Sequence, residues 1–384
     1  MAKKPFTPIP PMAELPPAEE INVREILDRY LAGEIDLICV LGPTASGKTR
    51  YAVRLAREIN SLLSGYPVES GLHVDSGTPG PCHPRHGSGG TTSEAKWWGE
   101  RSERPGDLSL HEAGSSEIGA EIISADSRQV YRGMDIGTGK DLAEYEEIPY
   151  HLMDIVDAGE KYNIFEYQRD FEKAYRDIRG RGCIPILCGG SGLYIEAATC
   201  GYSLPEVPPD PQLRAELEKK SDEELIAQLA SLKPLHNNTD HDTRKRLIRA
   251  LEIAIYEAEH PVERTAFLPK NTYYIGTLVT REERNARIDR RLDVRLDEGM
   301  VDEIRSLMDG THPAMTEGHG PVPAEDLIYY GLEYKFVTLY ITGELTFDQM
   351  RTQLATAIHQ FAKRQMTWFR GMERKGIRIH WTDV

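Results

Sequence analysis

The residues best suited to chemistry form a glycine-rich segment: Gly42, Pro43, Thr44, Ala45, Ser46, Gly47, Lys48 and Thr49. It fits the pattern G-x-x-x-x-G-K-[ST], in which two glycines let the backbone curl so that several N–H groups point at one anion. Lys48 adds a point charge, Thr49 offers a hydroxyl group to Mg²⁺, and a following helix would aim the positive end of its dipole at the same place. The segment predicts a phosphate or pyrophosphate ligand without saying which molecule carries it.

The elements needed to position this loop flank it in the required order. Residues 37–41 (LICVL) are an apolar run typical of a buried strand. After the loop, Ala52, Leu55, Ala56 and Ile59 recur at the spacing of one helix face. Strand, loop and helix in this order favour a phosphate site over a plain glycine-rich turn.

A second polar segment, SADSRQVY at 124–131, follows a predicted strand at 121–125. Ligands of open α/β sheets bind beyond the carboxyl ends of the strands, so we expect Asp126 to project towards the phosphate loop. A carboxylate there can bind Mg²⁺ or accept a proton from a nucleophile. The other interpretation of Asp126 is a cap for the next turn.

Two further glycine-rich turns belong to the same predicted site. Residues 137–140 (GTGK) supply a bend and a cation, and residues 189–194 (GGSGLY) follow a predicted strand at 184–188 with free N–H groups and a hydroxyl. Three strand ends that meet at one sheet edge indicate a single composite site.

Charge and composition limit the partners. The chain has 384 residues and a formal net charge of −15, which argues against a uniformly basic nucleic-acid coat. Positive charge is nevertheless gathered at 244–249, 281–295 and 363–378, where a polyanion could bind locally. Solvated helix faces are the alternative interpretation of each cluster.

The five cysteines form no C-x-x-C pair, so we expect reduced thiols, a cytoplasmic protein and no zinc site. No apolar run approaches the roughly 20 residues of a membrane helix, and we expect no membrane partner.

Alternation of strands and helices predicts an α/β fold, with a phosphate-loop core around a mostly parallel sheet, a small all-helical insertion and a helical C-terminal part. We divide the chain into an N-terminal arm and lead-in (1–34), a core (35–205), a helical insertion (206–268) and a C-terminal part of the core (269–384). The segment 62–118 is rich in Gly, Ser, Pro, Glu and Arg and predicts a disordered insert.

Finer expectations complete this outline. Within the insert, Trp97 and Trp98 are placed at a flexible tip, and residues 1–20 in a loose arm. Capping boxes are predicted at Ser221 with Glu224 and at Thr346 with Gln349. A strand is expected at 274–279, and everything after it is expected to be helical.

The order of these segments resembles the tRNA dimethylallyltransferase family, also called tRNA isopentenyltransferases. The resemblance spans about residues 35 to 381, is interrupted by the insert, and rests on residues 42–49, 126–131 with 135–140, 189–194, 246–252 and 362–369. Members transfer a dimethylallyl group from its pyrophosphate to N6 of the adenosine just 3′ of the anticodon, in tRNAs that read codons beginning with U. They have a P-loop core and a helical insertion that helps to clasp the anticodon arm.

The resemblance implies roles for individual residues. Lys48, Thr49 with Mg²⁺, and Arg281 would stabilise the leaving pyrophosphate, and Asp126 would accept the proton of the adenine amine. The partners implied are the anticodon arm of tRNA and dimethylallyl pyrophosphate, and we expect a monomer. Contacts with tRNA are implied for Asp126, Ser127, Arg128, Gln129, Ser191, Arg214, Lys245, Arg246, Leu247, Ile248 and Arg249.

Three departures from the family pattern stand in the sequence. Ser191 occupies a position where Thr is common, and it keeps the hydroxyl. Asp141 stands where Pro usually follows the turn at 137–140, and residues 236–243 replace a more regular turn of the helical insertion.

Three other functions fit parts of the sequence. A small-molecule kinase would need only the phosphate loop, and an adenylate isopentenyltransferase would not need the basic segments around Arg249 and Arg364. A non-enzymatic RNA-binding or nucleotide-switch protein is disfavoured because Lys48, Thr49 and Asp126 are all intact. Transfer from dimethylallyl pyrophosphate to tRNA or to AMP would separate them.

Overall fold

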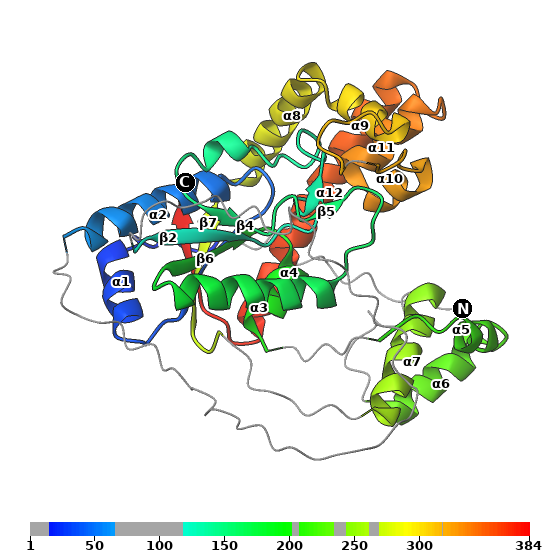
Figure 1. Cartoon of the computed structure of the whole chain (residues 1–384), viewed down its shortest axis with the longest axis horizontal. Coiled ribbons are helices and arrows are strands. Elements are labelled where there is room, and N and C mark those ends of the chain that lie inside the picture. The colour runs from blue at the N-terminus through cyan, green and yellow to red at the C-terminus, as the bar shows by residue number, and fades with distance from the viewer. Residues whose placement is uncertain (1–14, 66–117, 202–206, 234–242, 261–268, 317) are drawn as a thin grey trace, which may run out of the picture.

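A six-stranded parallel sheet forms the centre of the molecule, in the strand order β4-β2-β6-β1-β7-β8 (Figure 1). The computed structural model describes residues 15–65, 118–201, 207–233, 243–260, 269–316 and 318–384. A separate parallel pair joins β3 and β5. The strands are β1 (Leu37–Leu41), β2 (Ala120–Ser124), β3 (Tyr131–Arg132), β4 (Tyr150–His151), β5 (Val156–Asp157), β6 (Ile184–Gly189), β7 (Thr272–Leu278) and β8 (Ile379–Asp383).

Helices cover both faces of the sheet, as the α/β prediction requires, and this fold class is confirmed. Helices α1 and α2 pack on one face, and α3, α4 and the end of α12 pack on the other. The helices are α1 (Val23–Leu31), α2 (Lys48–Leu63), α3 (Ile164–Gly180), α4 (Gly192–Thr199), α5 (Pro211–Leu217), α6 (Asp222–Leu232), α7 (Arg244–Glu259), α8 (Arg281–Asp297), α9 (Met300–Asp309), α10 (Ala324–Tyr330), α11 (Leu332–Ile341) and α12 (Phe347–Arg374), with a 3₁₀ turn at Leu142–Glu144.

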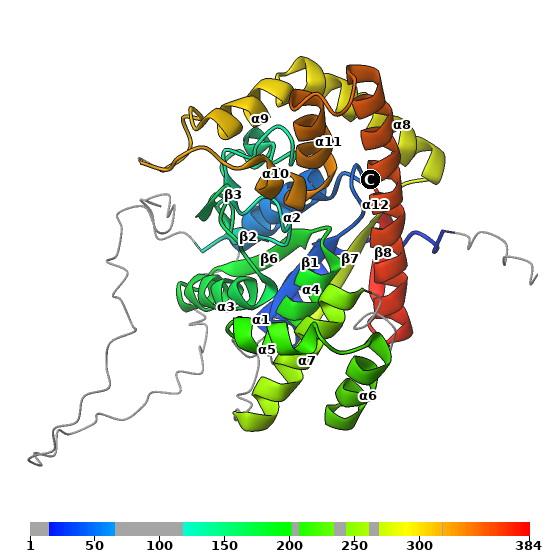
Figure 2. The ribbon, with the colours of Figure 1, turned by 90° about the vertical axis from the view of Figure 1, so that its right-hand side faces the viewer.

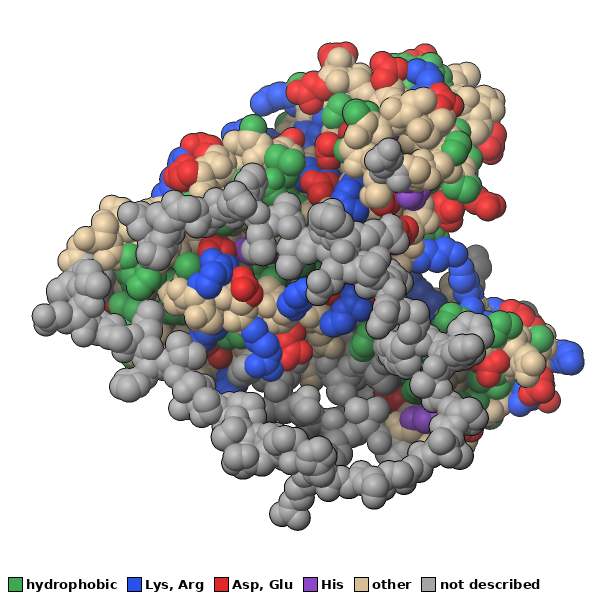
Figure 3. All heavy atoms as spheres, viewed as in Figure 1, with side chains coloured by type: hydrophobic (Ala, Val, Ile, Leu, Met, Phe, Trp, Pro, Cys, Tyr) green, Lys and Arg blue, Asp and Glu red, His purple; other side chains and the backbone are tan. Residues whose placement is uncertain are grey.

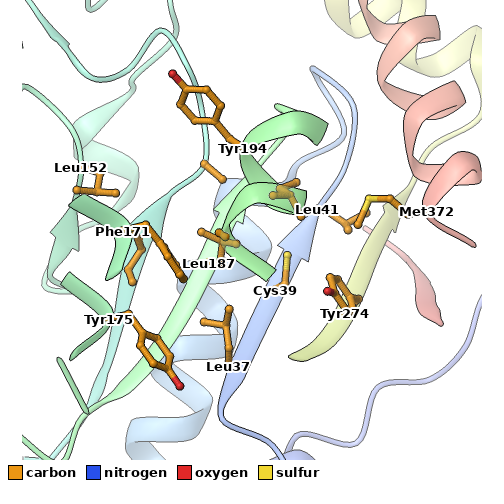
Figure 4. Close-up of a cluster of buried hydrophobic side chains, with 14 of the residues drawn as sticks. Leu37, Cys39, Leu41, Leu152, Phe171, Tyr175, Leu187, Tyr194, Tyr274 and Met372 are labelled. Atoms are coloured by element: carbon orange, nitrogen blue, oxygen red, sulfur yellow. The ribbon is translucent and has the colours of Figure 1, made fainter. Parts of the chain in front are cut away.

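The central strand β1 shows why its sequence is apolar throughout. Leu37, Cys39 and Leu41 point into the core under α3 and α4 (Figure 4), whereas Ile38 and Val40 pack under α1 and α2. Successive side chains of a strand point to opposite faces, and both faces are covered here, so all five positions are buried. The strands predicted at 37–41, 121–125, 184–188 and 274–279 are confirmed as β1, β2, β6 and β7, and their ends differ from the predicted ones by at most two residues.

The long helix α12 connects the sheet to a C-terminal group of helices (Figure 2). Its first half packs with α8 to α11 in a third core, and its second half contributes Met366, Phe369 and Met372 to the core of the sheet. The predicted capping box at Thr346 and Gln349 is confirmed.

The prediction that everything after β7 is helical is wrong at the end of the described chain. Residues 379–383 form β8, which pairs in parallel with β7 and buries Ile379 and Trp381. The strand alternates apolar and polar side chains over only five residues, a pattern too short to distinguish from a loop without its partner.

The N-terminal lead-in is more structured than predicted from residue 19 onwards. The N–H of Glu19 donates to the carbonyl of Trp381 at 2.6 Å, and α1 buries Ile26 and Leu27 against α2. Residues 1–14 lie outside the described residues, as do residues 66–117 with Trp97 and Trp98.

Helices α5, α6 and α7 share a core of their own, made chiefly of leucines from all three. The predicted capping box of Ser221 and Glu224 opens α6 and is confirmed. The boundaries assigned to this insertion remain a prediction, because residues 202–206 and 261–268 on either side lie outside the described residues. Among the described helices, none is both long and apolar enough to cross a membrane.

Candidate active site

The glycine-rich segment joins the carboxyl end of β1 to the first residue of α2, so the predicted order of strand, loop and helix is confirmed. Ala45 (φ 61°) and Gly47 (φ 80°) both have left-handed backbone conformations, which turn successive N–H groups towards one side. The first amides of α2, beginning at Lys48, have no carbonyl partner within the helix. Their N–H groups and the helix dipole make this side of the loop an anion-binding surface.

The loop is held against β7 by a buried hydrogen bond. The hydroxyl oxygens of Ser46 and Thr277 lie 2.6 Å apart. A Cβ atom at position 42 would come within 2.1 Å of the Thr277 hydroxyl and 2.5 Å of that of Ser46. Glycine at 42 is therefore required by the close approach of these two hydroxyl groups.

Asp126 lies just beyond the end of β2, and its carboxylate is close enough to Lys48 of the loop to interact with it electrostatically. Burial lowers the pKa of the half-buried Lys48, and the Asp126 carboxylate opposes that shift, while Arg291 and Arg295 add to it. Oδ1 of Asp126 accepts a hydrogen bond from the N–H of Arg128 at 3.0 Å. The carboxylate therefore closes a local turn, as the capping interpretation expects, and it also lies near Lys48; its role towards Mg²⁺ or a proton stays a prediction.

The end of β6 meets the end of β2 through Ser191. The N–H of Ser127 donates to the Ser191 hydroxyl at 3.2 Å, and the two serine hydroxyl oxygens lie 3.4 Å apart. The structure thus brings together the phosphate loop, Asp126, Ser127 and Ser191, and the convergence of three strand ends is confirmed.

Arginines gather at the start of α8. Arg281 is the first residue of this helix, directly after β7, and Thr280 caps it by accepting the N–H of Glu283 at 3.2 Å. Burial lowers the pKa of Arg284, and the neighbouring Arg281 and Arg370 lower it further. Cations from two helices therefore crowd one region, as a site for a polyanion requires.

A pocket opens next to Thr44 and Ala45 of the loop. Apolar side chains line it together with Arg291, Arg295 and Glu333. Burial, with a contribution from Arg291, lowers the pKa of Arg295 to about 10, and burial raises the pKa of Glu333. The sequence placed the two arginines only in a general basic cluster, and nothing in the pattern pointed to Glu333.

Two polar residues near the site turn inwards rather than towards a ligand. Lys140 is 1% exposed; its ammonium donates to the Tyr131 carbonyl at 3.0 Å, to Asp135 at 2.5 Å and to Asp154. The prediction that Lys140 offers a cation to the site is therefore wrong. Gln129 is also buried, where it accepts the Ser124 hydroxyl at 2.9 Å.

The remaining predicted tRNA contacts lie in the helical insertion. The side chains of Leu247 and Ile248 are buried in its core, so neither can reach a partner. Arg214 and Arg249 both pair with the buried carboxylate of Glu252.

On the same unit, Lys245 and Arg246 have exposed side chains at the start of α7. These two residues are the predicted contacts of α7 best placed to meet a polyanion. Figure 3 shows blue and red side chains interspersed over the visible face of the molecule, in keeping with local rather than uniform basic regions.

Oxygen ligands for a magnesium ion are present at the loop. Thr49 supplies a hydroxyl, which also hydrogen-bonds the buried Tyr145, and Asp126 supplies a carboxylate. In the described part of the chain, no three His, Cys, Asp or Glu side chains gather as a metal cage. This donor set fits Mg²⁺, which is commonly held by one or two protein oxygens together with substrate phosphates and water.

Comparison with known proteins identifies the family. The family model described as IPP transferase matches residues 129–372. A protein named tRNA dimethylallyltransferase 1 from Parabacteroides distasonis is 55% identical over 354 residues, which cover 91% of this chain and 92% of the relative. A protein named tRNA dimethylallyltransferase 2 from Bacteroides fragilis is 49% identical over 355 residues, which cover 91% and 94%.

Solved structures agree with these relatives. The full-length tRNA isopentenylpyrophosphate transferase from Bacillus halodurans is 28% identical, with a TM-score of 0.52 over 91% of this chain and 89% of that one. A eukaryotic dimethylallyltransferase acting on tRNA, 21% identical with a TM-score of 0.59, shares the fold. The site has a phosphate loop with an aspartate near it at the carboxyl edge of a parallel sheet, and both the family model and the relatives match most of the chain. The chain therefore belongs to the IPP transferase family.

Proposed function

We propose that this transferase moves a dimethylallyl group from dimethylallyl pyrophosphate to N6 of the adenosine immediately 3′ of the anticodon, in tRNAs that read codons beginning with U. The observation that carries the proposal is the phosphate loop after β1 with Asp126, which follows β2 on the far side of β6, near Lys48. The names of the relatives, all tRNA dimethylallyltransferases, supply the substrate class.

The pyrophosphate is the leaving group and occupies the phosphate loop. As the bond between C1 and the pyrophosphate oxygen breaks, negative charge grows on the leaving group and C1 gains allylic cation character. The loop N–H groups, Lys48 and Arg281 stabilise that negative charge where it develops. Thr49 would hold Mg²⁺ at the loop, and the ion would supply further positive charge to the leaving group.

The nucleophile is the exocyclic amine of adenine. Its nitrogen forms the new bond to C1, and Asp126 accepts the proton that the amine loses. Because this amine is a weak nucleophile, its orientation matters more than the strength of the base. The adenine must leave its stack to reach the site. We assign its entry to the region of Ser127, Arg128 and Ser191, which hydrogen bonds hold together with Asp126.

The helical insertion would hold the anticodon arm by its phosphates. Lys245 and Arg246 provide exposed cations for this contact. Arg214 and Arg249 act within the insertion, since Glu252 fixes both of them. We further propose that the enzyme acts as a monomer in the cytoplasm, where tRNA is available and the described cysteines, which form no disulfides, would stay reduced.

Incubation with radiolabelled dimethylallyl pyrophosphate and either bulk tRNA or AMP tests the proposal. We expect label in tRNA, at the adenosine 3′ of the anticodon, and none in AMP. Label in AMP alone would indicate an adenylate isopentenyltransferase, and label in neither would reject transferase activity towards both. Lys48→Ala serves as the negative control, because it removes a charge-assisted phosphate contact.

A further inference from the structure

Gln365, in the second half of α12, makes two hydrogen bonds that no sequence pattern indicated. Its Oε1 accepts the N–H of Thr44 in the phosphate loop at 2.8 Å. Its Nε2 donates to the carbonyl of Gly190, at the end of β6, also at 2.8 Å. The side chain is only 6% exposed. One buried amide therefore links the phosphate loop to a second strand end of the site.

The two bonds run in opposite directions, which makes the amide group specific. A neutral side chain with one acceptor and one donor, at this length, satisfies both backbone groups. A carboxylate would accept from Thr44 but could not donate to Gly190, and an apolar side chain could do neither. A Cβ atom at position 190 would lie 2.5 Å from the Gln365 Nε2. Glycine at 190 leaves the space that this amide occupies.

The bond to Thr44 falls next to the strained part of the loop. Ala45, the following residue, has a left-handed backbone conformation at φ 61°. Such a conformation is unfavourable for a residue with a Cβ atom and persists where the surroundings hold it. Ser46, on the other side of Ala45, is held by Thr277. The strained residue is thus held from both sides.

The helix that carries Gln365 is itself fixed close by. The indole N–H of Trp368 donates to the buried carboxylate of Glu196 on α4 at 3.0 Å. The ammonium of Lys375 binds the other oxygen of Glu196 at 2.6 Å. These contacts anchor α12 to the helix that follows Gly190, so the Gln365 amide projects from a firm support.

We propose that Gln365 is a positioning residue for pyrophosphate binding, which holds the loop in the conformation that directs its N–H groups at the ligand. This inference rests on the proposed function for the identity of the ligand. Gln365 touches the backbone of the loop and not the reacting atoms, so its effect is on the binding of the pyrophosphate group.

Two variants and a matched control test the inference. Gln365→Met removes both bonds with little change in length, and we expect the Kd for inorganic pyrophosphate and the KM for dimethylallyl pyrophosphate to rise roughly ten- to a hundredfold. The KM for tRNA should change less than twofold. Gln353→Glu, at an exposed position of the same helix, should leave all three constants unchanged.

Gln365→Glu separates positioning from simple packing. Its carboxylate is repelled by the Gly190 carbonyl, whereas its protonated form can donate to that carbonyl and still accept from Thr44. Pyrophosphate binding should therefore recover as the pH is lowered in this variant, relative to the wild type and Gln353→Glu. Calorimetric titration with inorganic pyrophosphate measures this without tRNA.

An unchanged pyrophosphate Kd in Gln365→Met, or a Gln365→Glu pH profile identical to that of the wild type, would overturn the inference. Equal losses for pyrophosphate and tRNA would also overturn it, by indicating general damage to the fold. If the wild type binds pyrophosphate but transfers nothing to tRNA, the proposed function fails while these binding tests of Gln365 remain valid.

Discussion

Asp126→Asn is the most direct test of the chemistry, because the structure separates the two roles of this side chain. Oδ1 of Asp126 accepts the N–H of Arg128 at 3.0 Å, and an asparagine oxygen can accept the same bond. The turn after β2 should therefore persist. What disappears is the negative charge near Lys48 and the ability to take a proton from the adenine amine.

The size of the effect follows from that loss. A positioned general base typically contributes 10²- to 10⁴-fold to the rate. At about 1.36 kcal/mol per tenfold change, this is about 2.7 to 5.4 kcal/mol of transition-state stabilisation. We expect kcat to fall in this range, with the Kd for tRNA nearly unchanged.

The assay is single-turnover transfer of labelled dimethylallyl to tRNA, together with a filter-binding Kd for tRNA and a thermal unfolding curve. Asp302→Asn provides a matched control, since its carboxylate is exposed and pairs with Arg305 away from the loop. Turnover of Asp126→Asn within about threefold of the wild type would refute a role as the base. A fall in activity accompanied by a lowered melting temperature would refute the claim that the turn survives.

Three further predictions concern the rest of the chain. Deletion of residues 66–117 should leave folding and transfer largely unchanged. Asn60 of α2 accepts the N–H of Ala120, the first residue of β2, at 2.7 Å, so the two ends lie close together, and loop length has a small effect on stability. Loss of soluble protein or of activity would show that the segment is needed. Lys245→Ala with Arg246→Ala should flatten the dependence of log K for tRNA on log salt and raise the KM for tRNA alone, whereas an unchanged salt slope would exclude this surface from RNA binding. Burial raises the pKa of Glu121, but hydrogen bonds from Arg181 and His151 outweigh this and bring the pKa to about 2. The Glu121 carboxylate therefore stabilises the fold above about pH 4.5 and loses that effect as the pH falls towards 2. Between these pH values, Glu121→Gln should lose less unfolding free energy than the wild type, and identical acid titration curves for the two proteins would contradict the assignment.

The centre of the sheet could be predicted because its signals are local. The run from Leu37 to Leu41 is apolar throughout and is followed at once by the phosphate loop. Adjacent residues therefore predict both that the strand is buried and that it leads into the phosphate site. Asp126 and Ser191 were predictable for a related reason. Each directly follows a buried strand, and parallel strands bring their carboxyl ends to one edge.

Features that depend on distant partners could not be predicted in this way. Lys140 looks like a free cation until Asp135 and Asp154 are seen around it. Gln365 lies in segment 362–369, which carries the family resemblance, but its partner Thr44 is 321 positions earlier in the chain, so the sequence did not reveal this hydrogen bond. The same holds for β8, whose five residues become a strand only beside β7.

The strand order also has a consequence for how the chain must be made. β1 emerges early from the ribosome, yet its two neighbours in the sheet, β6 and β7, begin only at residues 184 and 272. At about 5–20 residues per second, an apolar strand with both edges open persists for several seconds or longer during synthesis. Of the helices that cover the strand, α1 and α2 are made early, and both pack on the same face, so the other face has no early cover. Nascent chains of this protein are therefore expected to need chaperones that bind short apolar segments, and fast overexpression should favour aggregates seeded by residues 37–41.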